Sequence, residues 1–315
     1  MSITFRPGIR EKVGLLVGLA GASGSGKTFS AFRLASGMAG EKPFCVIDTE
    51  ARRALHYGDS FRFDHCDLKP PFSPHAYAEA IAAADAAGYP VIVVDSCSHE
   101  HAGEGGIRDI QEAEFARLGN KDSAKMLSWA TPKREHKKMV QRLLQIRAHL
   151  ILCFRAEEKI EMARNADGRM EVRKKQTATG LDGWQPICEK TLPYELTASF
   201  LLMAAKPGVP LPIKLQEQHR ALFPLDKPIT EESGKLIAAW AAGGKKLDAK
   251  PNAESNFVSP DQAINLEDKL KDAGIDKASL LGAMQKAGLD ATSISLLPSA
   301  AYQRALDWIG RAASK

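Results

Sequence analysis

The stretch GLAGASGSGKTFSAFRLASG, residues 18–37, decides the fold. Gly21 and Gly26, with Lys27 and Thr28, match G-x-x-x-x-G-K-[ST] residue for residue. In this motif a glycine-rich loop turns backbone N–H groups toward phosphates at the positive amino end of a helix. A flexible turn of small residues is the alternative. The apolar run before the loop and the helical pattern after it instead supply the strand, loop and helix that phosphate binding requires.

The loop and one distant aspartate predict a site for ATP and Mg²⁺. Lys27 is expected to neutralise phosphate charge, and the Thr28 hydroxyl to bind Mg²⁺. Asp95 ends the apolar run VIVVD and is the second expected Mg²⁺ ligand, acting through water, although it could instead only cap the next turn. The expected nucleotide contacts are Gly21, Ala22, Ser23, Gly24, Ser25, Gly26, Lys27, Thr28 and Phe29.

Hydrolysis also needs a group that orients and polarises the attacking water. Glu50, which ends VIDTE, is the first candidate, and Glu100, in SHEHAGEGG, is the second. Asp48 or Glu50 could instead cap a loop. Arg155, in ILCFRAE, is placed either to sense the γ-phosphate or to pair with a nearby glutamate of the same segment.

Cys97, His99 and His101 alternate along the chain, and side chains at this spacing share one face of an extended segment. A zinc site needs a fourth ligand, and none is apparent. The pattern therefore favours a loop that carries polar side chains near the nucleotide or DNA, and Mg²⁺ is the only metal that we expect.

Short apolar runs alternate with helical patterns, which is typical of a parallel sheet covered by helices. The expected strands are 12–20, 44–50, 90–96 and 149–157, and the expected helices are 28–39, 73–88 and 130–147. Farther on, a hairpin is expected around Asp167 and Gly168, strands over 192–204 and 212–216, and a helix over 229–244 that Thr230 caps. We expect an α/β ATPase core over residues 1–244, a linker over 245–262, and a small helical module over 263–315.

Composition narrows the class of protein. The chain has 315 residues and a net charge of +5, so its total charge indicates little about nucleic acid. Basic residues are concentrated in 132–147 and 169–180, where a solvated helix or hairpin face is the alternative to a binding surface. The chain contains neither a run long enough to span a bilayer nor a secretory signal pattern, which predicts a cytoplasmic protein without a membrane partner.

Together, GASGSGKT, VIDTE and VIVVDS resemble the RecA-like ATPase core. In that family the glutamate that closes the strand after the first helix activates water, a role that the resemblance assigns to Glu50. VVDSCSHEHAGEGG, LILCFRAEEKIE, EKTLPYELTASFLLMA and ITEESGKLIAAWAAGG resemble phage-encoded RecA-like ATPases, which are related to phage single-strand annealing recombinases. The resemblance covers residues 12–244. Arg155 departs from the polar amide sensor of RecA, and the first residues show no aromatic motif for subunit docking.

The resemblance implies a homo-oligomeric ring or filament that hydrolyses ATP and acts on single-stranded DNA in phage recombination or replication. The loops 99–128 and 158–182 are expected to face DNA. The residues expected to contact the phosphate backbone of the DNA are Arg164, Arg169, Arg173, Lys174 and Lys175. Two other functions stay open: an ATPase motor or helicase loader that acts on a protein partner, and a nucleotide-gated binding module with little turnover.

Overall fold

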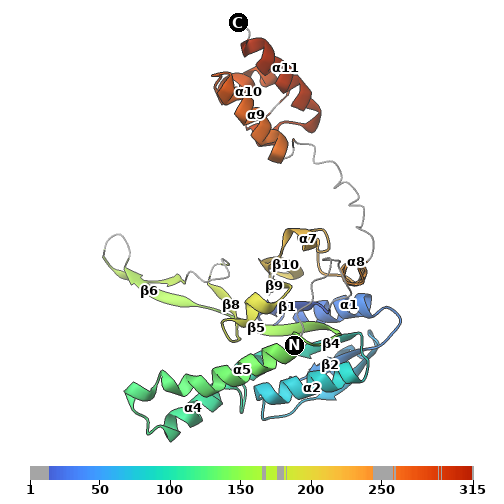
Figure 1. Cartoon of the computed structure of the whole chain (residues 1–315), viewed down its shortest axis with the longest axis vertical. Helices are drawn as coiled ribbons and strands as arrows, with labels where there is room; N and C mark the ends of the chain where they lie inside the picture. Colours follow the sequence, from blue (N-terminus) through green and yellow to red (C-terminus); the bar gives the residue numbers. More distant parts are fainter. Residues whose placement is uncertain are drawn as a thin grey trace, which may run out of the picture. The chain divides into compact units, whose positions relative to one another are not determined.

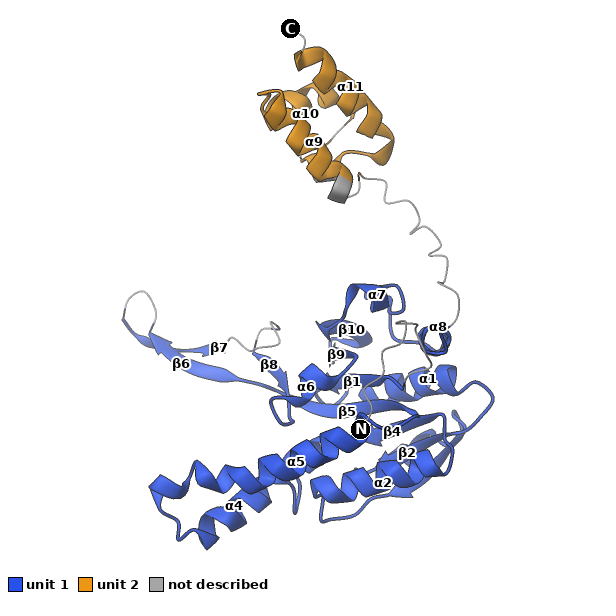
Figure 2. Cartoon of the chain, viewed as in Figure 1, with its two compact units in different colours: residues 1–244 blue, residues 245–315 orange. Residues whose placement is uncertain are grey.

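The chain consists of two compact units, Met1–Gly244 and Lys245–Lys315 (Figure 2). The computed structural model describes residues 14–164, 168–175, 181, 183–243, 258, 260–289, 291 and 293–313. The expected linker, 245–262, lies mainly outside these residues. Its last residues belong to the helix α9, Pro260–Asp272.

A mostly parallel sheet of eight strands forms the centre of the first unit (Figure 1). The strand order is β10-β9-β1-β5-β4-β2-β3, and β8 pairs with β5. Among the described strands of this sheet, only β8 and β10 run antiparallel to their partners. The strands are β1 Leu16–Gly21, β2 Phe44–Asp48, β3 Phe63–Asp67, β4 Val91–Asp95, β5 His149–Glu158, β8 Trp184–Pro186, β9 Ala198–Met203 and β10 Lys206–Lys214. The predicted α/β class is confirmed.

Helices cover both faces of this sheet (Figure 1). On one face, α1 (Lys27–Ala39) and α8 (Glu231–Ala241) pack on an apolar cluster that includes Phe32 and Phe200. On the other, α2 (Pro74–Ala86) and α5 (Ala130–Leu143) pack on a cluster that includes Tyr77 and Met139. Because both faces are covered, a central strand such as β4 is buried along its whole length, which explains its continuous apolar sequence.

The expected hairpin is present. Strands β6 (Ile160–Arg164) and β7 (Met170–Lys174) pair antiparallel, separately from the main sheet (Figure 1). The predicted turn residue Asp167 lies outside the described residues, and the neighbouring Gly168 has φ 75°.

The strand β8 and residues 206–211 of β10 were not predicted, and three further segments differ from the expectation. The strand β3 was not predicted, because an edge strand with alternating half-buried and exposed residues lacks an apolar run. The expected loop 99–128 is largely helical, with α3 (Ser98–Ala102), α4 (Ile107–Arg117) and two 3-10 turns, η2 (Asp122–Ala124) and η3 (Leu127–Trp129). In α4 only Ile107 is fully buried, so its sequence shows no apolar period.

The third difference concerns the expected strand 192–204, which begins with a helical turn, α6 (Leu192–Glu195), before β9. Pro193 lies in its first turn, where proline is favoured. Thr230 precedes α8 as expected, but its side chain makes no capping hydrogen bond. The remaining short helices of this unit are η1 (Arg53–Tyr57) and α7 (Glu217–Arg220).

The second unit is helical, as predicted. α9, α10 (Lys277–Lys286) and α11 (Tyr302–Ala313), with the 3-10 turns η4 (Ile294–Leu296) and η5 (Ser299–Ala301), surround an apolar cluster. The Asp276 side chain caps α10 by accepting a hydrogen bond of 2.8 Å from the Ser279 N–H. Within the part of the chain that the structure describes, no helix has both the length and the apolar character needed to cross a membrane.

Two glycines let α1 and α8 approach closely, and this contact gives the first prediction. A Cβ atom on Gly37 would collide with the Glu231 backbone, and one on Gly234 with the Leu34 carbonyl. Gly37→Ala is therefore expected to destabilise the protein by about 1–3 kcal/mol through overpacking, measured as thermal unfolding by circular dichroism. Gly282→Ala, in an open part of α10, is the control and should not destabilise. Equal stability of the two variants would contradict the close packing.

Candidate active site

The carboxyl ends of adjacent parallel strands meet at one edge of the sheet. Gly21 of β1 is in register with Arg155 of β5, and Asp48 of β2 with Asp95 of β4. A pocket of about 910 Å³ opens at this edge. Its lining combines the glycine loop with residues after β2, β4 and β5: Gly21, Ala22, Ser23, Gly24, Gly26, Lys27, Thr28, Glu50, Arg53, His56, Tyr57, Asp95, Arg155, Ala156 and Ile187.

The glycine loop has the backbone that phosphate binding requires. Gly24 and Gly26 have φ of 75° and 81°, a region that residues with a Cβ atom rarely adopt. Gly26 directly precedes α1, so the positive amino end of a 13-residue helix borders the pocket. Lys27 lines the same pocket, and its Nζ donates a hydrogen bond of 2.9 Å to the Ala22 carbonyl across the loop. The arrangement provides fixed N–H donors and one mobile cation for a polyphosphate.

Two of the nine expected nucleotide contacts do not line the pocket. Ser25 is fully buried, and its hydroxyl donates a hydrogen bond of 2.8 Å to the Ala22 carbonyl, which closes the loop. The Phe29 ring packs against Tyr57 and Phe61, at centroid distances of 6.1 and 5.5 Å. The Ser25 side chain therefore holds the loop, whereas the Phe29 ring, which is 45% exposed, packs beside η1.

Thr28 and Asp95, the two expected Mg²⁺ ligands, lie in contact with each other. The Thr28 hydroxyl donates to the Asp95 carboxylate over 2.5 Å. Burial raises the pKa of Asp95 above its ordinary value, although Thr28 and Lys27 oppose this shift. A divalent cation would favour the ionised carboxylate, and hard oxygen donors are the ligands that Mg²⁺ prefers. These residues therefore fit Mg²⁺, which would neutralise phosphate charge when bound.

Glu50 and Arg155 both line the pocket, where they form an ion pair with two hydrogen bonds. The Arg155 Nε and Nη2 atoms donate to the two Glu50 carboxylate oxygens over 2.9 and 2.6 Å. Burial acts to raise the pKa of Glu50, but Arg155, with His99 and Arg53, more than offsets it, so this pKa lies below its ordinary value. Glu50 is therefore held ionised, as a group that polarises water must be.

Asp48, not Glu50, caps the turn after β2. Its carboxylate accepts hydrogen bonds from the backbone N–H of Glu50, over 2.6 Å, and of Ala54, over 2.9 Å. Its Oδ2 atom also lies 3.1 Å from the His65 ring. Because Asp48 holds the turn, the Glu50 carboxylate is left to face the pocket.

Glu100, the second candidate for water activation, does not line the pocket. It is 1% exposed, and its Oε1 atom lies 2.9 Å from Nδ1 of His136 on α5. Burial raises the pKa of Glu100. Burial also opposes a charge on His136, but the Glu100 and Glu189 carboxylates raise the pKa of the imidazole. The geometry favours Glu50 over Glu100, and the choice between them stays a prediction.

Cys97, His99 and His101 have separate surroundings. Cys97 is buried, and His101 lines a different cleft, described below. The His99 ring contacts the Thr49 hydroxyl at 2.8 Å and lies 3.9 Å from a Glu50 oxygen. His99 thus belongs to the support of Glu50.

The sequence analysis missed the pocket residues Arg53, His56 and Tyr57 on η1. Ala51 and Arg52 have φ of 57° and 65°, so the chain reverses directly after β2 and returns η1 to the pocket. Their position within seven residues of Glu50 was the available signal. Left-handed backbone at two non-glycine residues could not be read from the residue types.

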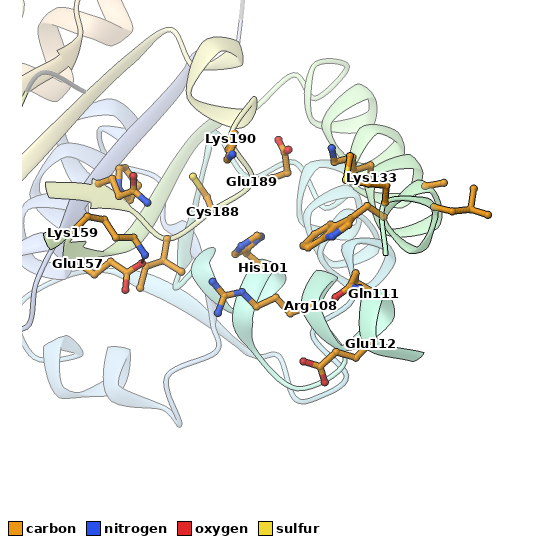
Figure 3. A pocket seen from close by; sticks show the side chains of 17 residues that line it. His101, Arg108, Gln111, Glu112, Lys133, Glu157, Lys159, Cys188, Glu189 and Lys190 are labelled. Carbon is orange, nitrogen blue, oxygen red and sulfur yellow. Dashed lines mark ion pairs between the residues drawn. The ribbon is translucent and has the colours of Figure 1, made fainter. Parts of the chain in front are cut away.

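A second cleft, of about 700 Å³, lies beside the nucleotide pocket. Figure 3 shows its side chains, with His101 and Arg108 from α3 and α4 approaching Glu157 and Lys159 from the β5 side. Ile187 lines both the cleft and the nucleotide pocket. The Ser98 hydroxyl ties this wall together, because it accepts from the Arg155 N–H over 2.9 Å and donates to the Ile187 carbonyl over 2.7 Å.

Removing the loop cation gives the second prediction. Lys27→Ala is expected to weaken ATP binding and to lower the hydrolysis rate at least about 100-fold, because phosphate charge loses its main positive partner. The measurements are nucleotide binding and phosphate release by the purified protein. Lys42→Ala, at an exposed site outside the pocket, is the matched control. Undiminished turnover in Lys27→Ala would refute the phosphate-loop assignment.

The third prediction separates the two candidate glutamates. Glu50→Gln should retain nucleotide binding but lose most turnover, since an amide keeps the shape of the carboxylate without its charge and basicity. Glu100→Gln should retain turnover at a temperature where it is folded, because Glu100 pairs with His136 outside the pocket. Single-turnover hydrolysis and binding of a slowly hydrolysed analogue check both variants. The roles must be exchanged if only Glu100→Gln loses turnover.

A comparison with known families agrees with this geometry. A family model described as an AAA domain matches residues 14–185, which is more than half of the chain. The match includes the phosphate loop, Glu50, Asp95 and Arg155. No curated protein matches the chain. The family match, together with the pocket that contains the loop, shows that the chain belongs to the AAA domain family, a group of P-loop ATPase domains that bind nucleotide.

Proposed function

We propose that the protein is an oligomeric, Mg²⁺-dependent ATPase that acts on single-stranded DNA in phage recombination or replication. The observation that carries this proposal is the course of β5. Arg155 lines the nucleotide pocket, while Glu157 and Lys159, only a few residues later, line the second cleft. The chain then enters the β6–β7 hairpin. A change at Arg155 is therefore transmitted along one strand to the cleft and the hairpin.

The Glu50–Arg155 pair is the element that ATP would change. Arg155 donates hydrogen bonds to both carboxylate oxygens of Glu50. A triphosphate in the same pocket competes for the guanidinium, because phosphate oxygens accept the same two-point hydrogen bonding. Release of one Glu50 oxygen leaves it able to orient water toward the γ-phosphate. ATP binding thereby shifts Arg155 and prepares Glu50 in one step.

The chemistry of the second cleft supports a single-stranded nucleic acid. Met126 and Leu127 are 84% and 62% exposed there, beside the half-buried Trp129. The aromatic ring of Trp129 can stack on a base, the apolar side chains beside it extend that contact, and cations nearby hold phosphates. The exposed cations of the cleft are Arg108, Lys133 and Lys190.

Two of the three carboxylates in the cleft already have partners. Glu157 pairs with Lys159, and a Glu189 oxygen accepts from the Thr191 N–H and hydroxyl over 2.6 Å each. The Lys159 ammonium offsets the Glu157 charge, whereas Glu189 keeps its charge because its Thr191 donors are neutral.

The hairpin cations are not equivalent. Arg173 pairs with Glu161 over 2.9 Å, and Lys174 with Glu158 over 2.8 Å. Arg164 and Lys175 are exposed, and within the described residues neither forms an ion pair. We therefore expect Arg164 and Lys175 to contribute more to DNA binding than Arg173 and Lys174. The hairpin face that carries Arg164 and Lys174 also exposes the apolar side chains Ile160, Met162, Met170 and Val172.

The fourth prediction tests whether the β6–β7 hairpin contributes to the binding of single-stranded DNA. Arg164→Ala with Lys175→Ala should weaken ATP-dependent binding of single-stranded DNA and reduce its salt slope by about 1.4, since two counterion-releasing contacts are lost. Arg173→Ala with Lys174→Ala is the matched control and should have a smaller effect, because their carboxylate partners already reduce the available charge. The measurement is a titration at several salt concentrations with a slowly hydrolysed ATP analogue.

Electron microscopy of the same complexes tests the oligomer, for which rings or filaments are expected. An affinity and salt slope unchanged by Arg164→Ala with Lys175→Ala would contradict the DNA role of the hairpin. If ATP hydrolysis then rises with a helicase and not with DNA, the loader function replaces the proposed one.

A further inference from the structure

Helix α5 carries a row of cations that the ATPase site does not use. Its buried residues are Pro132, His136, Met139, Val140 and Leu143. Lys133, Arg134, Lys137 and Lys138 are exposed, and at about 100° per residue they lie within an arc of about 140° on the opposite face. We call these four residues the α5 stripe. The basic segment noted in the sequence therefore forms one continuous surface.

The α5 stripe keeps most of its positive charge. Glu135 is the one acidic residue of the helix sequence, and its Oε1 atom lies 3.7 Å from Arg134 and 3.1 Å from Lys138. Within the described residues, no ion pair neutralises Lys133 or Lys137. Four cations against one carboxylate leave a net charge of +3 along the helix face. Such a surface attracts a polyanion.

A groove of about 520 Å³ runs between α5 and the first turn of α2. The two helices lie side by side on one face of the sheet (Figure 1). Arg134, Lys137 and Lys138 line the groove, together with Arg142, which is paired with Glu79 over 2.6 Å. No described residue of this groove also lines the nucleotide pocket or the second cleft, although Lys133, at the start of the α5 stripe, lines the second cleft. The groove is therefore a separate site.

We propose that the α5 stripe and its groove bind the phosphate backbone of duplex DNA. The α5 stripe spans six residues, or about 9 Å of the helix, and one strand of a B-form duplex carries about three phosphates over that length. A rigid row of cations thus matches a rigid row of phosphates in extent and charge. Contacts of this kind position a duplex without reading its sequence.

The same residues fit a duplex better than a single strand. Sites for single strands combine cations with aromatic side chains on which bases stack. The exposed residues of α5 include no Phe, Tyr or Trp, and neither does the described lining of the groove. The second cleft, which contains Trp129, is the contrasting surface. The inference goes beyond single-strand binding and does not depend on it.

The test uses the full chain and a labelled duplex of about 20 base pairs, without ATP, in an anisotropy titration at several salt concentrations. Arg134→Ala, Lys137→Ala and Lys138→Ala together should lower duplex affinity at least about tenfold and reduce the salt slope by about 2.7, since three phosphate contacts are lost. The matched control is Lys42→Ala, Lys227→Ala and Lys235→Ala, three exposed lysines outside the groove. This control should bind duplex as the unaltered protein does.

Two further measurements make the outcome specific. Basal ATP hydrolysis should be equal in the two triple variants, because neither changes a residue of the nucleotide pocket. ATP-dependent binding of single-stranded DNA should persist in both. The proposal is wrong if the α5 variant binds duplex as tightly as the control variant, or if polyglutamate of equal charge competes as well as duplex DNA does. If Arg164→Ala with Lys175→Ala loses single-strand binding and the α5 variant does not, the duplex result still supports a separate duplex site.

Discussion

The in-register pairing of β1, β5, β4 and β2 is the constraint on which the site depends. Parallel strands in register end together, so Gly21, Arg155 and Asp95 arrive at one edge although more than a hundred residues separate the first two. A shift of β5 by one residue would turn Arg155 to the opposite face of the sheet. The fully buried side chains on both faces, including Ile92 and Ile151, oppose such a shift.

Around this edge, polar side chains fix one another's positions through hydrogen bonds. The Asp48 carboxylate holds the turn that carries Glu50. In the same turn, the Thr49 hydroxyl contacts the His99 ring. Ser98 joins Arg155 to Ile187, at the wall between the nucleotide pocket and the cleft. Buried polar networks of this kind are stable in a few discrete arrangements, since each unmade hydrogen bond is costly. The ion pair of Glu50 with Arg155 is the exposed end of this network and the part that a triphosphate reaches.

Local signals predicted the phosphate loop and much of the fold. The loop, the central strands and the hairpin have residue types that favour one backbone, so spacing was sufficient. The edge strand β3 and the helix α4 were missed because little of either is buried. The second cleft could not be predicted, because it forms only where residues near 101–133 meet residues near 157–190. The pairing of Arg173 with Glu161 follows from the hairpin register, and the sequence contained that signal.

The most direct test of the account is the ATP hydrolysis rate of the purified full chain, measured with saturating Mg²⁺-ATP and increasing single-stranded DNA. Arg155 and the cleft share one strand and one wall, so the account predicts a basal rate that rises with DNA and then saturates. The same titration with Glu50→Gln should stay flat. A basal rate that single-stranded DNA leaves unchanged at every concentration, in protein that demonstrably binds the DNA, would contradict the coupling.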